Sequence, residues 1–254
     1  MKASIGSYTP FIQEGWRLFK VEWGFFIIAI LIFIIIETFD GLFGIDSPTG
    51  SIIVTILSGM ASLLLTVGFF QAIINYIDTS TMRFETFFHA YKKPKKVVRY
   101  MLGYIIMSFV IYGSATAIAG LLIGTLYLTE PEIFTDVSLA VAAKTNIFES
   151  IKPILVQLVA IFTLVLSAII YLSTRLRFTM YLIIDKDFGP VRATKNSLHI
   201  TKGNFWYIFW FTMCLIALNL LGLIFFMIGL AITIPVSIIA YTLFYRSIVQ
   251  KHAF

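Results

Sequence analysis

The sequence predicts an all-α protein, a polytopic membrane helical bundle of about six transmembrane helices in three hairpins. The 254 residues are 59% hydrophobic and only 13% charged, whereas soluble domains are about half apolar and about a quarter charged. The apolar residues also fall in long runs, and the basic residues lie between alternate runs. A soluble fold could not cover so large an apolar excess with so few charges, so we expect residues 1–254 to form a single integral membrane domain.

Six apolar stretches provide the expected spans. The first four run from about Phe25 to Phe43, Ile52 to Ile77, Val97 to Leu128 and Ile154 to Thr174. The run from Gly203 to Tyr245 contains no Asp, Glu, Lys or Arg. At about 1.5 Å per residue it is long enough to cross a ~30 Å hydrocarbon core twice. We place the turn between spans five and six at about Leu221 to Leu223.

The distribution of Lys and Arg predicts the orientation. If the N-terminus is cytoplasmic, 17 of the 19 basic residues fall on the cytoplasmic side, as the positive-inside rule requires. The exceptions are Lys144 and Lys152, in or at the end of the outer loop after span three. Both termini are then cytoplasmic. Within this loop, Asp136–Ile151 has the composition of a helix that covers the outer surface or gates a cavity.

A basic cluster precedes span three, formed by Lys92, Lys93, Lys95 and Lys96 around Pro94. Its position favours a juxtamembrane anchor on anionic lipid of the inner leaflet; a specific lipid-headgroup or partner site is the alternative. No separate soluble module is present to carry nucleic-acid recognition, so we expect no nucleic-acid partner.

Each odd-numbered span follows a similar entry segment. Gly15–Trp23 and Ser197–Phe205 align without gaps, whereas Ala90–Lys93 is a looser copy. Such segments suit amphipathic helices in the cytoplasmic interface, with Lys and Arg at the headgroups. We therefore expect three pseudo-repeats, approximately 11–78, 84–174 and 190–250, which arose by triplication or by independent selection for interfacial anchors.

Small residues suggest where helices approach each other. Span three carries Gly113, Gly120 and Gly124 at four-residue spacings from other small residues, a pattern that permits close helix packing in lipid. The partner is either another helix of the chain or a second copy in a homo-oligomer. Pro235 within span six removes a backbone donor and predicts a kink.

Chemistry-bearing patterns are scarce. No HExxH, paired-cysteine, GxSxG, P-loop or GxGxxG motif occurs, so we expect no enzyme activity, no catalytic residue, no metal and no cofactor. Few ionisable residues fall at membrane depth, where they often mark function. Glu37 is the one carboxylate that reaches span depth, and it is either functional or interfacial.

The stretch from Arg177 to Trp206 is the most distinctive part of the chain. Its pattern contains Asp185, Gly189, Ala193, Ser197 and Lys202-Gly203-Asn204-Phe205-Trp206, followed downstream by Gly229, Pro235 and Tyr245. Across residues 175–250 the chain resembles bacterial multi-pass membrane proteins. These include the membrane domain fused to some glycerophosphoryl diester phosphodiesterases and related uncharacterised inner-membrane proteins. The resemblance implies a scaffold in the bacterial inner membrane without a reaction, because catalysis in the fused enzymes belongs to a separate soluble domain.

Two interpretations of this motif stay open. In the structural one, Ser197 and Asn204 satisfy backbone groups, Gly203 permits the bend and Trp206 anchors at headgroup depth. In the other, Asp185, Ser197, Lys202 and Asn204 hold a lipid headgroup.

Two functional hypotheses follow. The first is a non-catalytic inner-membrane protein that binds membrane phospholipids or supports membrane and envelope homeostasis. The alternative is a transporter or export permease, in the form of a membrane subunit of a larger complex or of a protein acting alone, and it predicts a polar cavity between the hairpins.

Overall fold

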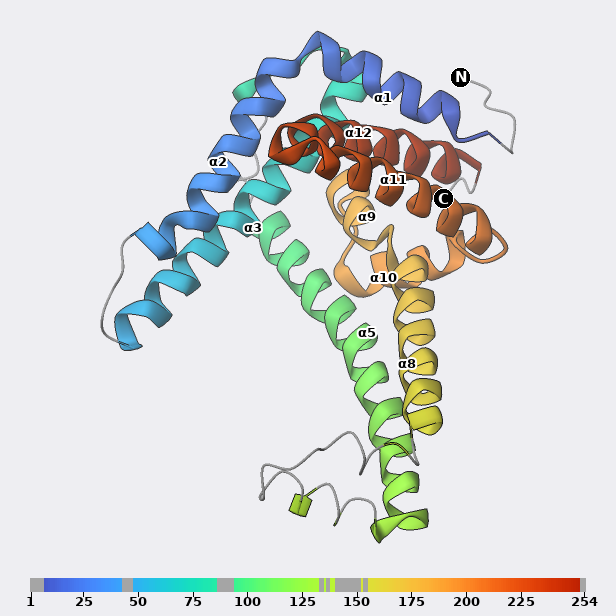
Figure 1. The fold of residues 1–254 in the computed structure, drawn as a ribbon. Coiled ribbons are helices and arrows are strands. Elements are labelled where there is room, and N and C mark those ends of the chain that lie inside the picture. Colours follow the sequence, from blue (N-terminus) through green and yellow to red (C-terminus); the bar gives the residue numbers. More distant parts are fainter. Residues whose placement is uncertain are drawn as a thin grey trace. The chain divides into compact units, whose positions relative to one another are not determined.

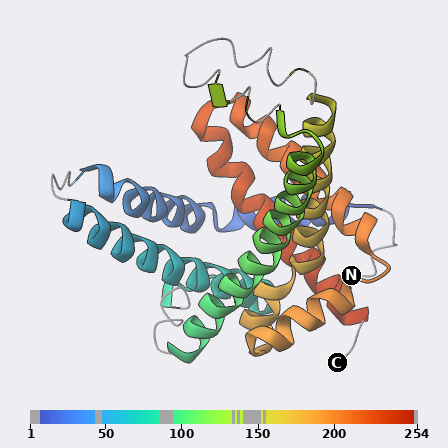
Figure 2. The same cartoon turned by 90° about the horizontal axis from the view of Figure 1, so that it is seen from below.

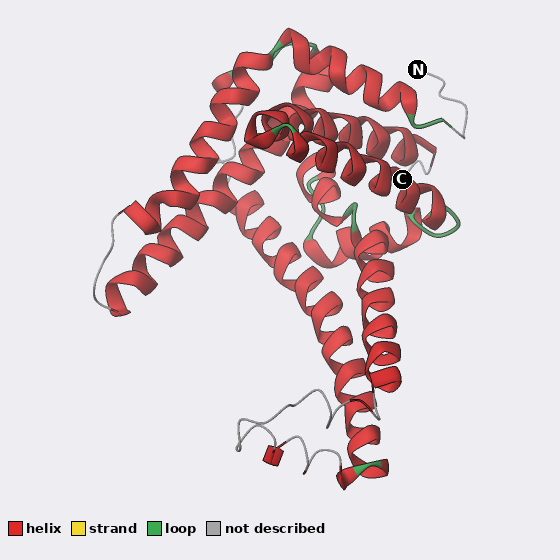
Figure 3. Cartoon of the chain, in the orientation of Figure 1, coloured by secondary structure: helices red, strands yellow, loops and turns green. Residues whose placement is uncertain are grey.

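The structure, a computed structural model, describes residues 7–42, 48–85, 94–132, 135, 138–139, 152 and 155–251. This part of the chain contains helices and no strand (Figure 3), so the predicted all-α class is confirmed. The helices are α1 (Thr9–Val21), α2 (Trp23–Leu42), α3 (Pro48–Thr79), α5 (Pro94–Thr129), α8 (Leu155–Leu176), α9 (Thr179–Lys186), α10 (Pro190–Ile200), α11 (Phe205–Ile224) and α12 (Phe226–Lys251) (Figure 1).

Five helical segments are long and apolar enough to cross a membrane. They are Val54–Thr79, Pro94–Thr129, Leu155–Lys186, Phe205–Ile224 and Gly229–Gln250. Helix α1 and residues 23–36 of α2 meet the criterion only as a pair, and this pair is bent by 88°. The chain is therefore a multi-pass membrane protein with five or six candidate spans, in agreement with the expected number of about six.

The chain divides into two compact units. The first unit contains residues 1–104 and 177–254, and the second contains residues 105–176. In the first unit, α2 lies beside α3, α12 lies beside α11, and α1 packs along α12 (Figures 1 and 2). A buried cluster that includes Phe26, Phe69, Ile73 and Ile239 joins α2, α3 and α12. This core holds the ends of α3 and α12 near each other.

The entry segment of the first span forms the helix that its sequence predicts. Phe11, Gly15 and Phe19, spaced four residues apart, form the buried face of α1, as expected for an amphipathic helix. The hydroxyl of Tyr76 donates a 3.0 Å hydrogen bond to the carbonyl of Leu18 and so ties the last turn of α1 to α3. The looser copy at Ala90–Lys93 lies outside the described residues.

The turn between α11 and α12 corrects one expectation. We placed it at Leu221–Leu223, but α11 continues to Ile224 and the break falls at Phe225. Gly222 is part of α11 and lies in contact with Gly229. A Cβ added to Gly229 would overlap the carbonyl oxygen of Gly222. These two glycines permit a close backbone approach of the two helices. Pro235 lies further along, inside α12.

The second unit consists mainly of the remainder of α5 and of α8. Many of its large apolar side chains are exposed, among them Phe109 and Phe162, which suits helices surrounded by lipid. Within the described part of the chain, a Cβ on Gly120 or Gly124 would meet no atom within 4 Å, so the expected packing partner of these glycines stays a prediction. Of the expected outer-loop helix Asp136–Ile151, the structure describes only residues 138–139.

Candidate functional site

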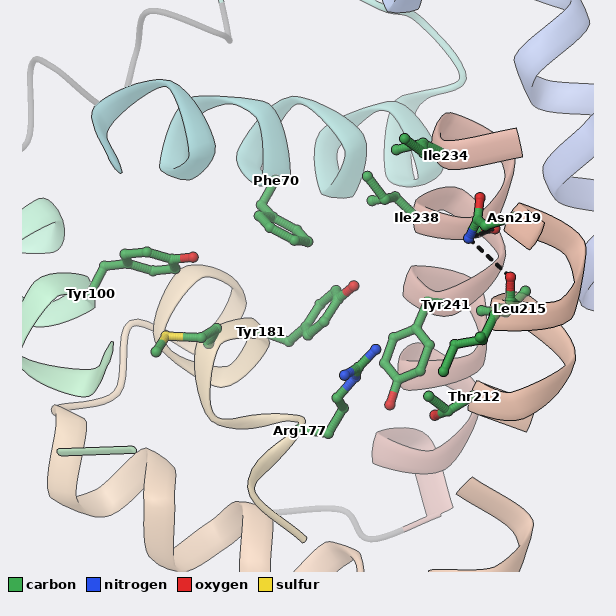
Figure 4. Close-up of a pocket in the computed structure, with 13 residues that line it drawn as sticks. Phe70, Tyr100, Arg177, Tyr181, Thr212, Leu215, Asn219, Ile234, Ile238 and Tyr241 are labelled. Carbon is green, nitrogen blue, oxygen red and sulfur yellow. Dashed lines mark hydrogen bonds between the residues drawn. The ribbon is translucent and has the colours of Figure 1, made fainter. Parts of the chain in front are cut away.

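The first unit contains a partly enclosed cavity of about 310 Å³ between α3, α5, α9, α11 and α12 (Figure 4). Aromatic side chains form much of its wall, with Phe70 from α3, Tyr181 from α9 and Tyr241 from α12. Arg177 is the charged residue among those that line it, and its side chain reaches toward Tyr181 and Tyr241 (Figure 4). The cavity thus combines one cation with an aromatic and largely apolar surface.

Arg177 is held by a short turn between α8 and α9. The next residue, Phe178, is fully buried, and its N–H donates a 3.2 Å hydrogen bond to the hydroxyl of Ser197. With Phe178 anchored, the Arg177 guanidinium lies 5.1 Å from the ring centroid of Tyr241, within the range of a cation–π interaction. Among the described residues, no carboxylate lies within ion-pair distance of Arg177.

A polar wall connects α11 and α12 on another side of the cavity. The Asn219 side-chain amide donates to the Leu215 carbonyl at 2.9 Å and to the Ser237 hydroxyl at 3.1 Å. Because a carbonyl only accepts, the first bond sets the orientation of the amide. The second bond joins the two helices, so the cavity wall is connected across α11 and α12.

A second polar feature, the carboxylate–arginine cluster, consists of Asp78, Asp185, Tyr245 and Arg246. The hydroxyl of Tyr245 donates to Asp185 Oδ2 at 3.0 Å. Arg246 pairs with Asp185 at 3.1 Å and with Asp78 at 2.6 Å. The Asp185 side chain is only 6% exposed. Since its members come from α3, α9 and α12, the cluster ties three helices together.

One family model matches residues 16–252. The chain belongs to that family, described as a protein of unknown function, DUF975. No curated protein and no solved structure gives a significant match. Membership in DUF975 agrees with the broad part of the resemblance, to uncharacterised membrane proteins, and does not show the resemblance to the membrane domain of glycerophosphoryl diester phosphodiesterases.

The DUF975 chain separates the motif residues into an interior and a surface group. Asp185 and Ser197 are buried and bonded within the protein. The Asn204 amide donates to the Ile200 carbonyl at 3.4 Å. Lys202 and Trp206 are exposed. The structure therefore does not present the motif as one set of groups around a ligand, because Asp185 is engaged in the carboxylate–arginine cluster.

The basic cluster before span three divides in a similar way. Lys92 and Lys93 lie outside the described residues, and Lys95 is exposed. Lys96 is 9% exposed, and its ammonium donates a 3.0 Å hydrogen bond to the side chain of Gln71 on α3. Lys96 therefore connects α5 to α3 in the DUF975 chain, which differs from its expected place among the headgroups.

Sequence reasoning missed the roles of Arg177 and Arg246, which it only counted as cytoplasmic basic residues. For Arg177 the sequence contains no signal of this role, because Arg175 lies two residues before it and the pair has the pattern of basic residues at the cytoplasmic end of a span. For Arg246 no local pattern points to Asp78 and Asp185, which lie far away in the sequence.

Proposed function

We propose that this protein is a non-catalytic integral membrane protein that binds anionic phospholipid of the cytoplasmic leaflet. The observation that carries the proposal is the exposed Lys202, three residues before an aromatic surface with two exposed tryptophans at the start of α11. A lysine at headgroup level above interfacial tryptophans is a favourable arrangement for an anionic lipid.

The aromatic surface consists of Phe205, Trp206, Phe209 and Trp210. Their rings contact one another in sequence, with centroids 5.2 to 6.0 Å apart. Trp206 is 66% exposed and Trp210 is 54% exposed. Tryptophan side chains prefer the membrane–water interface because one part of the indole is apolar and its N–H is polar. This surface suits the glycerol and upper acyl region of a lipid whose phosphate lies at Lys202.

We also propose that the protein lies in the bacterial inner membrane, that both termini are cytoplasmic and that the spans form three hairpins. The charge distribution supports this orientation, because it places 17 of the 19 Lys and Arg residues on the side of the anionic inner leaflet. The physiological role would be to organise lipid or to support the membrane and envelope. The open face around Gly120 and Gly124 offers a place for a second copy or another membrane subunit.

The test compares lipid retention in nanodiscs by native mass spectrometry. The wild-type chain should retain phosphatidylglycerol in preference to phosphatidylcholine. Lys202→Gln should weaken this retention about fivefold, since one lysine near an anionic surface contributes about 1 kcal/mol. Lys195→Gln removes an equal charge from the exposed face of α10 and should weaken retention less than Lys202→Gln. Equal retention of the two lipids, or no effect of Lys202→Gln, would contradict the proposal.

A transporter or export permease is the second candidate, and the cavity in Figure 4 favours it, because transport requires a site among the spans. Flux of an anionic amphiphile across proteoliposomes measures this directly. Flux that depends on the protein and falls in an Ile216→Phe variant, which would narrow the cavity, supports transport. Binding without flux supports the first candidate.

A further inference from the structure

We propose that the Arg177 cavity is a binding site for one anionic amphiphile, a molecule with a phosphate or carboxylate on an apolar body. The anion would pair with Arg177, and the apolar body would lie against Phe70, Leu215 and Ile216. This site goes beyond the proposed function, because neither Lys202 nor Trp206 lines the cavity.

The first argument is the charge of Arg177. Arg177 is an exposed residue, and its guanidinium is the cationic group among those that line the cavity. The contact that the structure provides is the face of the Tyr241 ring. The planar fork of N–H donors in a guanidinium matches the two oxygens of a phosphate or carboxylate. An anionic ligand would therefore supply the charge partner that the described carboxylates do not.

Arg246 provides a comparison within the same unit. It lines another cavity, of about 280 Å³, together with Glu14 and Asp78. Its charge is already compensated there by Asp78 and Asp185. Arg177 differs in that the described residues include no carboxylate at ion-pair distance. Charge complementarity therefore favours an anion at the Arg177 cavity over one at the Arg246 cavity.

The second argument is the shape and lining of the cavity. Its 310 Å³ falls at the lower end of the volumes of small-molecule sites, about 300–1,000 Å³. It is only partly enclosed, so it can take a headgroup and the first part of a chain while the rest extends outward. A purely apolar ligand would provide no anion for Arg177, and an inorganic anion would leave the apolar walls formed by Phe70, Leu215 and Ile234 in contact with water. An anionic amphiphile pairs with Arg177 and also covers these apolar walls.

The experiment measures the melting temperature of the purified full-length chain in a neutral detergent, titrated with defined probes. Dodecyl phosphate and laurate should each raise the melting temperature in a saturable manner, because a ligand that binds only the folded state stabilises it. Dodecyltrimethylammonium and inorganic phosphate should not. Arg177→Gln should weaken the apparent affinity at least about tenfold, as expected for loss of a charge-assisted hydrogen-bonded pair.

Matched variants separate the site from general effects. Arg83→Gln removes the same charge from an exposed segment after α3 and should bind as wild type. Ile216→Phe keeps Arg177 but should fill part of the cavity and weaken binding of the amphiphile. If Arg177→Gln fails to fold, the affinity of Ile216→Phe tests whether the ligand binds in this cavity. The relative response to dodecyl phosphate and laurate distinguishes a phospholipid from a fatty acid as the source of the anion.

Three results would overturn the proposal: unchanged binding in both Arg177→Gln and Ile216→Phe, an equal response to inorganic phosphate, or an equal response to the cationic amphiphile. The lipid-surface proposal fails on a different measurement, phosphatidylglycerol retention by Lys202→Gln in nanodiscs. Each of the two sites can therefore fail alone.

Discussion

The carboxylate of Asp185 accepts a 3.0 Å hydrogen bond from the hydroxyl of Tyr245, sixty residues further along the chain. Arg246, the next residue, pairs with the other oxygen of the same carboxylate. The short helix α9 is therefore tied to the end of α12 at a point where both helices are largely buried. Since Arg177 precedes α9 by two residues, this connection also supports the cavity in which Arg177 lies.

We predict that Tyr245→Phe destabilises the protein by about 1.5–3 kcal/mol, the usual contribution of a hydrogen bond to a charged group. The variant keeps the ring and its packing against Phe178 and Tyr181, so the loss would report on the hydroxyl alone. Denaturation of the detergent-solubilised protein measures it. Tyr104→Phe, at an exposed position, is the control; equal stability of the two variants would contradict the role of the hydroxyl.

Removal of Arg246 should cost more than removal of Asp78. Arg246→Gln would leave the largely buried Asp185 carboxylate with Lys186, 3.4 Å away, as its cationic partner. The cost should therefore lie below about 3–5 kcal/mol, the cost of a fully broken buried ion pair. Asp78 is 52% exposed, so Asp78→Asn should cost about 0–1 kcal/mol. Thermal melting of both variants tests the order. Adding Asp185→Asn to Arg246→Gln should recover part of the loss, because it removes a largely buried carboxylate that has lost its arginine and keeps, among the described residues, only Lys186 as a cationic partner; no recovery would argue against this explanation.

Gly229→Ala should destabilise the α11–α12 pair by about 1–3 kcal/mol, the range for an overpacked contact. The reason is the overlap of an added Cβ with the carbonyl of Gly222. Gly120→Ala should be neutral or stabilising by up to about 1 kcal/mol, because its Cβ meets open space in the described structure and alanine favours a helix. A larger loss of stability from Gly120→Ala than from Gly229→Ala would instead indicate that another helix packs against α5 at Gly120.

The predicted orientation can be measured by cysteine labelling in a Cys214→Ser background. Lys202→Cys should be protected from an impermeant maleimide in intact spheroplasts, whereas Glu130→Cys should react. Both positions are exposed in the structure, so access differs only through the membrane. The opposite result would reverse the topology and place Lys202 away from the anionic inner leaflet.

The span positions could be predicted because hydropathy acts residue by residue. The run from Val97 to Leu128 predicted most of α5, and the expected amphipathic segment Gly15–Trp23 overlaps the observed helix α1 (Thr9–Val21). The α11–α12 turn was misplaced by a few residues, because Gly222 at the expected position lies inside α11, which continues to Ile224. Gly222 there permits the close approach of Gly229.

The candidate site was less accessible from sequence. The motif from Asp185 to Trp206 was recognised as distinctive, with two interpretations open: a structural turn, or a set of groups that holds a lipid headgroup. Asp185 pairs instead with Tyr245 and Arg246, while Lys202 and Trp206 remain on the surface. Local spacing contains no information on partners sixty residues away, so these roles could not be separated beforehand.

The sequence by itself determined that this chain is a multi-pass helical membrane protein, because the transfer free energy of each apolar run depends on its composition alone. Only the tertiary structure decided which polar groups compensate one another. It paired Arg246 with two carboxylates, placed Lys96 against Gln71, and put Arg177 in a cavity with the ring of Tyr241. Charged side chains are stabilised by neighbours in space, and those neighbours are set by helix packing.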